Sequence, residues 1–350
     1  MKRILIAAAV VIGALLLAGA FGYTGPEDLL KVLRNASPVY LLIFLLTSAL
    51  TFLIFAFRWQ FILRCQSERI PFRKIFSYKL MGYAVSYFTP AARIGGEPVR
   101  AYMLKRHGIR MSKGISSVLV DKMMEFVVEF GAGIIFLLVA ALFFTIPNQL
   151  KTAIIIAIPL GLGLLALSYY AIRRKWKPIS AFLRLAGKIF RIRWLHWARE
   201  KAIRVEQNFL FFFAFRKRET MKIAGINLFV WGLRFFEYKV ALLSFGYDAS
   251  MPQLFAAMLV MAVASIIPIP ASLGVAEAGQ ISLFSAFGAG PQIGLILALL
   301  LRARDVLISL TGMYLLSHEG VGFFEAFRNR NSEKNGYQYH KGKMIHYYKR

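Results

Sequence analysis

Residues 39–57 read VYLLIFLLTSALTFLIFAF, a stretch without a single charged side chain. An α-helix needs about 20 mainly apolar residues to cross roughly 30 Å of hydrocarbon. Comparable apolar blocks recur along the chain, at 4–22, 126–147, 152–172, 223–246, 253–267 and 291–317. The sequence therefore predicts an all-α, polytopic transmembrane helical bundle in a cell membrane.

The composition indicates which partners such a bundle meets. The chain has 350 residues, 58% of them hydrophobic, and a formal net charge of +27. On a soluble protein this charge would favour nucleic acid, but here the basic residues lie between apolar blocks. We therefore expect membrane lipids, anionic or phosphate-bearing, and no nucleic acid. The single cysteine, Cys65, excludes an intrachain disulfide and a cysteine-built zinc site, and we expect no cofactor and no metal.

Basic loops predict the orientation, because Lys and Arg accumulate on the cytoplasmic side. Lys2 and Arg3 place the N-terminus inside, ahead of an uncleaved first span. The loop after the second span is also basic, with Arg58, Arg64, Arg69, Arg73 and Lys74. The last span runs into another basic segment. Both termini are thus predicted to be cytoplasmic.

We divide the chain into a membrane domain and two basic regions. The membrane domain covers 1–320, with about six full spans plus shorter segments at 75–100 and 253–290. Residues 173–222 form a basic cytoplasmic loop, with an amphipathic helix at 196–218 as the other reading. Residues 321–350 are predicted to be a basic, disordered cytoplasmic tail.

The two shorter segments are predicted to be broken helices. Residues 75–100 lie between two basic loops and are too short to cross twice, so they would be re-entrant. Residues 253–290 would start and finish outside, either as a re-entrant segment or as two short spans. Irregular backbone at membrane depth is tolerated only where protein or a cavity surrounds it.

The broken segments resemble each other. One contains Pro90-Ala-Ala-Arg-Ile-Gly95-Gly96-Glu97, and the other Pro270-Ala-Ser-Leu-Gly274-Val-Ala-Glu277. Each has a proline, two small residues, a glycine and then a glutamate seven positions after the proline. Entry from opposite faces would make them an inverted repeat, a plan in which transporters hold substrate near the midplane.

Ionisable residues also occur inside the predicted spans. Each costs on the order of 2.5–3.5 kcal/mol at a helix centre, which indicates a polar cavity or ion pairs that only hold helices together. Arg302 with Glu97 or Glu277 is the pairing that we connect with function. The three groups are Asp121, Glu125 and Glu129 on one helical face, Arg234, Glu237 and Lys239, and Arg302, Arg304 and Asp305.

These motifs resemble the flippase-like integral membrane family, which also forms the transmembrane region of lysylphosphatidylglycerol synthetases. The resemblance rests on the stretches Pro90–Tyr102, Val118–Lys122, Pro268–Ala278 and Leu300–Arg302, and covers roughly residues 5–320. It implies a helical bundle that moves or binds lipids, including aminoacylated phospholipids or lipid-linked sugars. The synthetases carry a further soluble aminoacyl-transfer domain, which this sequence does not include, so we do not expect lysyl transfer.

The leading hypothesis is a lipid flippase or lipid-binding transporter for a phospholipid or a polyprenyl-phosphate-linked lipid. Arg93, Arg100 and Arg302 would hold the head-group phosphate. Glu97 and Glu277 would orient backbone N–H groups or bind a cationic head group, and Asp121 and Glu125 would line the route. The backbone of the site would come from Pro90, Gly95, Gly96, Pro270 and Gly274.

Two alternatives stay open. No hydrolase, zinc-protease or phosphate-loop motif occurs, so no catalytic residue is assigned. A membrane transferase using Glu97 or Asp121 as a base is still compatible with the sequence. So is a non-catalytic subunit that assembles with a partner membrane enzyme, or with a second copy of the chain.

Overall fold

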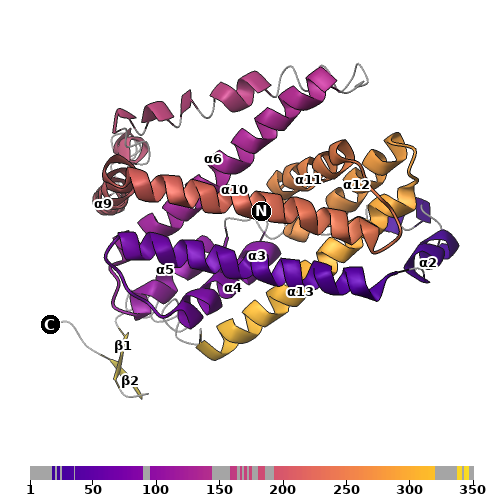
Figure 1. Cartoon of the computed structure of the whole chain (residues 1–350). Helices are drawn as coiled ribbons and strands as arrows, with labels where there is room; N and C mark the ends of the chain where they lie inside the picture. Colours follow the sequence, from indigo (N-terminus) through magenta and orange to yellow (C-terminus); the bar gives the residue numbers. More distant parts are fainter. Residues whose placement is uncertain are drawn as a thin grey trace.

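The computed structural model consists of α-helices with one small strand pair (Figure 1). The structure describes residues 18–19, 22–23, 26–34, 36–89, 95–143, 158–163, 166–167, 169–171, 173–175, 180–185, 193–319, 337–340 and 343–346. The predicted spans at 4–22 and 152–172 therefore lie largely outside the described residues.

The first half of the helical region begins with a short helix and continues with two long and two short helices. Its elements are α2 (Pro26–Arg34), α3 (Pro38–Cys65), α4 (Phe72–Phe88), α5 (Glu97–Arg106) and α6 (Met111–Phe143). Proline occupies the first turn of both α3 and α5, where its missing N–H has no intrahelical partner to lose.

The second half has the same order of long and short helices. Its elements are α9 (Arg193–Phe215), α10 (Lys217–Leu243), α11 (Met251–Ile266), the 3-10 turn η1 (Pro270–Ser272), α12 (Val275–Ala286) and α13 (Pro291–Glu319). Each of α10, α11, α12 and α13 begins about 180 residues after α3, α4, α5 and α6 respectively. The two sets of four helices are thus matched in order and spacing.

The long helices α3 and α10 lie side by side in opposite directions, and α13 packs across α4 and α12 (Figure 1). At one end, the N–H of Ser37 donates to the carbonyl of Ser244, 2.7 Å away. At the other end, Lys74 contacts the Glu319 carboxylate at 3.0 Å. The basic turns after α3 and α5 therefore meet the end of α13 on one side of the bundle.

The polarity of the bundle is reversed relative to a soluble protein. Arg58, Asp121 and Glu277 are fully buried, whereas Phe229 is 60% and Leu46 is 61% exposed. Water would penalise such an apolar exterior, but lipid chains would not. By length and apolar composition alone, α3 is the one helix of the described chain suited to cross a bilayer, and α11 is apolar but shorter. Charged residues interrupt the apolar surfaces of the long helices α6, α10 and α13.

Both predicted broken segments are interrupted helices. In the first, α4 ends at Phe88 and α5 begins at Glu97. In the second, α11 ends at Ile266, and η1 follows before α12. The backbone of Ala271, Ser272 and Gly274 has positive φ values of 55°, 51° and 75°. Such values are common for glycine but costly for other residues, so the surrounding structure must hold this turn in place.

Three local expectations differ from the structure. The second span does not end at residue 57, because α3 continues to Cys65 and carries Arg58 inside the bundle instead of in a loop. The helix expected at 196–218 ends at Phe215, and α10 starts at Lys217. Within the tail expected to be disordered, β1 (Tyr337–His340) pairs antiparallel with β2 (Lys343–His346).

Candidate functional site

The carboxylate of Asp121 is the centre of a buried ion-pair network. Its Oδ1 accepts from Arg58 Nε at 2.7 Å, and its Oδ2 accepts from Lys79 Nζ at 2.8 Å and from Arg100 Nη2 at 2.7 Å. These partners come from α3, α4 and α5, and Asp121 itself comes from α6. One carboxylate thus joins all four major helices of the first half.

Two further carboxylates extend this network. Glu97 accepts from Arg100 at 2.9 Å and lies 3.6 Å from Lys122. Glu125 lies 3.5 Å from Lys122 and 3.4 Å from Arg58. Four basic and three acidic side chains therefore share the site, which leaves one positive charge in excess. Buried charges are retained only when they are paired in this way or hydrated.

Close helix packing fixes the position of Arg100. Its guanidinium lies over the Trp59 ring, 4.0 Å from the centroid, in a cation–π contact. A Cβ atom on Gly82 would overlap the Arg100 side chain, so α4 must carry glycine there. The Gly96 N–H donates to Ser86 Oγ at 2.8 Å and ties the start of α5 to α4. Gly96, the glycine predicted from the sequence, therefore acts through a close approach of the backbones of α4 and α5.

A second ion-pair cluster faces the first. Glu237 accepts from Ser48 and, at 2.6 Å, from Arg304. Arg304 also contacts Asp305 at 2.8 Å. Glu237 comes from α10, Ser48 from α3, and the other two from α13. This cluster has one negative charge in excess.

Arg234, Glu237 and Lys239 do not form ion pairs with one another. Arg234 donates to Glu129 of α6 at 3.1 Å, and Lys239 contacts Asp248. Side chains three residues apart lie on one helix face, but here each finds its partner elsewhere.

A cavity of about 100 Å³ lies between the two clusters. At roughly 30 Å³ per water molecule, it has room for about three waters or one small oxyanion. Five basic and three acidic side chains line it, together with the rings of Phe52, Phe55, Tyr83 and Tyr87. The basic side chains are Lys79, Arg100, Lys122, Arg234 and Arg304, and the acidic ones are Glu97, Glu125 and Glu237.

The Glu277–Arg302 pair lies apart from this cavity. Arg302 Nε donates to Glu277 Oε1 at 2.5 Å, and its Nη1 approaches the carbonyl oxygen of Ala271 at 3.4 Å. Of the two partners expected for Arg302, the structure selects Glu277 and not Glu97. Arg302 thereby connects α13 to α12 and to the turn η1.

The two broken segments meet each other. A small hollow lies between the end of α4 and the turn around η1. Its lining residues are Ser86, Tyr87, Thr89, Ser265, Ile267, Ile269, Ala271 and Ser272. The end of α4 and the turn around η1, which lie far apart in the sequence, are thus neighbours in the fold.

The structure brings Glu97, Arg100, Asp121 and Glu125 together as predicted site residues. Pro90 and Arg93 lie outside the described residues. Gly95 and Gly96 form the turn before α5, and Pro270 and Gly274 lie in the turn before α12. Sequence reasoning missed Arg58, Lys79 and Arg304 as site residues. The signal of Arg58 and Lys79 was a basic side chain adjoining an apolar run, which equally suits a loop, whereas Arg304 was recognised as a charge inside the last span but not as a site residue.

Comparison with known proteins assigns the fold to a family. The sequence profile described as "Lysylphosphatidylglycerol synthase TM region" matches residues 4–312. The chain belongs to this family. The chain is also similar to proteins described as UPF0104 membrane proteins from several archaea. That of Methanothermobacter thermautotrophicus is 25% identical over 93% of this chain and 96% of its own length. That of Pyrococcus horikoshii is 28% identical, over 82% and 88% respectively.

The third relative, from Methanocaldococcus jannaschii, is 24% identical over 83% of this chain and 88% of its own length. The family is a membrane family, which agrees with the apolar exterior of the described helices. The resemblance seen in the sequence motifs is confirmed, and the chain is a membrane protein whose described residues are helical apart from the short strand pair.

Proposed function

We propose that this protein is a multi-pass transporter that moves a phosphate-bearing lipid between the leaflets of its membrane. The observation that carries the proposal is the charged cavity inside helices whose outer faces are apolar. Lipid chains can stay against the exterior, while the polar head group needs a route through the interior. A cavity with basic excess supplies that route.

The chemistry of the cavity suits an oxyanion. Lys122 and Arg234 are each about one-quarter exposed, and both face the cavity while paired with a carboxylate. A phosphate can replace a carboxylate as the partner of either basic side chain, because Glu97 keeps its pair with Arg100 and Glu129 is 41% exposed. Arginine adds directional hydrogen bonds to two phosphate oxygens. Asp121 differs, because three basic side chains already occupy its two oxygens.

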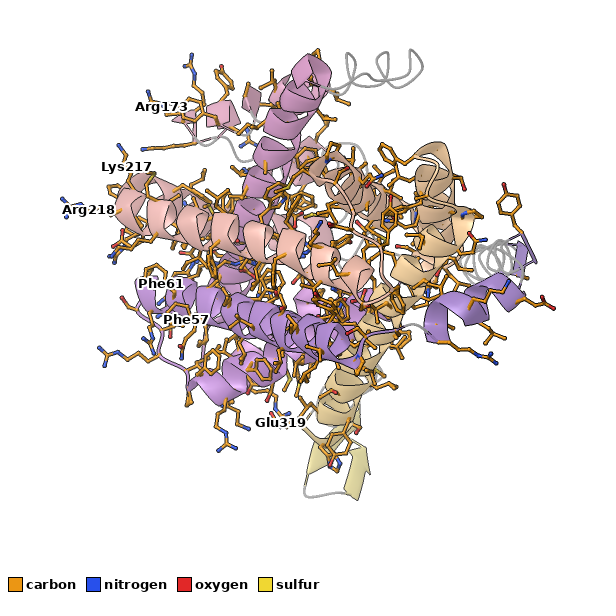
Figure 2. The ribbon with its side chains drawn as sticks, turned by 45° about the vertical axis from the view of Figure 1, so that its right-hand side comes forward. Phe57, Phe61, Arg173, Lys217, Arg218 and Glu319 are labelled. Carbon is orange, nitrogen blue, oxygen red and sulfur yellow. The ribbon has the colours of Figure 1, made fainter. Side chains whose placement is uncertain are left out.

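The proposed topology places both termini in the cytoplasm. Lys74, near the start of α4, and Arg106, at the end of α5, both contact Glu319 at the end of α13. Arg173, Lys217 and Arg218 project together from one side of the molecule (Figure 2). The positive-inside tendency supports assigning these basic ends to the cytoplasmic face.

An inverted repeat would give this site two-sided access. The matched order of α3–α6 and α10–α13 supports a duplicated unit, and the contact between the two interrupted segments supports a shared central site. In known transporter plans, such units hold substrate between them and expose it alternately to each face. We propose the same use for the segments 75–100 and 253–290, as re-entrant elements.

Translocation in proteoliposomes tests the proposal. Vesicles would carry a fluorescent phosphatidylglycerol or a polyprenyl phosphate, and a membrane-impermeant quencher would report the outer leaflet. We expect the parent protein to accelerate exchange of at least one of these lipids. Arg100→Gln should slow it, whereas Asp248→Asn, which removes an exposed pair distant from the cavity, should not. Exchange no faster than in empty vesicles for both lipids would refute the proposal.

The same preparations address a transferase. Both Asp121 oxygens are engaged by basic partners, which favours a structural role over general-base chemistry. Incubation with a lipid-linked donor followed by mass spectrometry would reveal a new product. A product that disappears in Glu97→Gln would favour the enzyme instead.

A further inference from the structure

The α5–α6 and α12–α13 units repeat each other in local detail. Gly108 and Gly288, 180 residues apart, both follow a helix end with positive φ, at 81° and 72°. Each terminates its helix through the same two backbone hydrogen bonds. These bonds are Gly108 N to Lys105 O and Ile109 N to Leu104 O, matched by Gly288 N to Ser285 O and Ala289 N to Phe284 O.

The polar side chains repeat at the same spacing. Four residues of α5 and α6 line the cavity, namely Glu97, Arg100, Lys122 and Glu125. The residues 180 positions later are Glu277, Gln280, Arg302 and Asp305. All four are polar or charged, and Glu277, Gln280 and Asp305 are buried. Apolar residues would suffice at these positions if they served only to pack α12 against α13. The four polar residues therefore indicate that a binding site has been retained there.

The equivalent ion pairs differ in tightness. Lys122 Nζ lies 3.6 Å from Glu97 Oε1, and their side chains are 26% and 13% exposed. Arg302 Nε lies 2.5 Å from Glu277 Oε1, and the Glu277 side chain is fully buried. The first pair lines the cavity, whereas in the second pair the carboxylate is closed off and the Arg302 side chain is 16% exposed.

The closed unit contains buried acceptors without partners. Glu277 Oε2 and Gln280 Oε1 have no hydrogen-bond partner among the residues that the structure describes, and both side chains are fully buried. An unpaired buried acceptor is unfavourable, and opening the unit to water, which can donate a hydrogen bond to it, would remove that penalty. The closed state is therefore one that can exchange with an open one.

We propose that α12 and α13 hold a second phosphate-binding site, closed in this structure, and that it opens when the cavity beside α5 and α6 closes. In the open state, the guanidinium of Arg302 and the amide NH2 of Gln280 donate to the phosphate oxygens, and Gln280 gives up its present bond to the Ala257 carbonyl oxygen. This inference rests on the proposed transport function. It adds that the two repeat units bind the same head-group chemistry in turn, and it identifies the residues of the second site.

Cysteine accessibility tests the exchange without measuring transport. In a Cys65→Ser background, Thr51→Cys reports the cavity, because Thr51 lines it and bonds only its own helix backbone. Ala298→Cys reports the second site, since Ala298 lies one helical turn from Arg302 and is 2% exposed. A charged maleimide would label both variants in phosphatidylcholine nanodiscs. We expect Thr51→Cys to label at least tenfold faster than Ala298→Cys.

Replacing either Lys122 or Arg302 should shift the equilibrium from the state with an open cavity toward the state with an open second site. Lys122→Arg tightens the first pair and Arg302→Lys loosens the second. In either background, labelling should fall at residue 51 and rise at residue 298, each by about threefold or more. If the two rates do not move in opposite directions in the variants that fold, the inference is wrong. Lys122→Arg keeps the positive charge at a partly exposed position, so we expect this variant to fold. Its labelling rates therefore test the inference even if Arg302→Lys does not fold.

Glycerol phosphate tests the ligand class. It should slow maleimide labelling of residue 51 in the Thr51→Cys protein. It should also slow labelling of residue 298 in a protein that combines Ala298→Cys with Lys122→Arg. Chloride at equal ionic strength should slow neither. Protection at residue 51 alone would overturn the second site. Opposite changes in labelling without lipid exchange in vesicles would instead refute only the transport of the lipids tested.

Discussion

Arg58 and Asp121 are both buried, and the guanidinium Nε of Arg58 donates to Oδ1 of Asp121 across 2.7 Å. The two residues lie on α3 and α6, 63 positions apart in the sequence. Arg58 also donates to Asn227 of α10. This pair therefore connects the helices that bring the two halves of the bundle together.

Asp121→Asn should strongly destabilise the protein. The amide cannot compensate Arg58, Lys79 and Arg100, and breaking a buried pair typically costs about 3–5 kcal/mol. Thermal unfolding in detergent would measure the loss. Asp248→Asn is the control, because exposed pairs contribute about 0–1 kcal/mol. Equal melting temperatures for the two variants would show that the Asp121 network does not stabilise the fold.

Gly82→Ala should destabilise the bundle and displace Arg100. The added Cβ would lie 2.5 Å from Arg100 Cγ, and overpacking of this kind costs about 1–3 kcal/mol. Gly225→Ala provides the matched control, since nothing lies within 4 Å of its added Cβ. Because alanine favours helix over glycine by about 0.5–1 kcal/mol, this control should be neutral or stabilising. A stable, fully active Gly82→Ala protein would contradict the close approach.

Arg100→Lys should weaken lipid translocation even though the charge is preserved. Lysine cannot reach Asp121 and Glu97 while also stacking on Trp59. We expect the rate at low lipid fraction to fall about tenfold, equivalent to about 1.4 kcal/mol. Arg216→Lys, at a half-exposed pair with Glu219, should transport normally. Indistinguishable rates for the two variants would remove Arg100 from the binding site.

Leu46→Arg should impair membrane insertion. Leu46 is 61% exposed near the middle of the apolar stretch 39–57, where a charge facing lipid costs on the order of 2.5–3.5 kcal/mol. The fraction of protein that resists alkaline extraction from membranes would report the effect. Leu33→Arg, on the charged helix α2, should insert like the parent. Normal insertion of the Leu46→Arg protein would mean that this face of α3 does not contact lipid.

Much of the fold could be predicted from local sequence. The apolar blocks marked the long helices, and the Pro/Gly motifs marked both interruptions, because proline and glycine disfavour a continuous helix wherever they occur. The spacing of Asp121 and Glu125 placed both on one face of a helix, and both belong to the site. The end of α3 was predicted too early, because charged residues such as Arg58 resemble a loop until their buried partners are known.

The sequence by itself determined that this chain is a helical membrane protein with two similar interrupted segments. Hydrophobicity, helix length and backbone restriction are properties of neighbouring residues, so the sequence carries them directly. Only the tertiary structure decided that Arg302 pairs with Glu277, that Arg58 and Lys79 join Arg100 on Asp121, and that a charged cavity lies between the halves. Ion pairs act over a few ångströms between distant parts of the chain, and helix packing decides which of many charged residues come within that range.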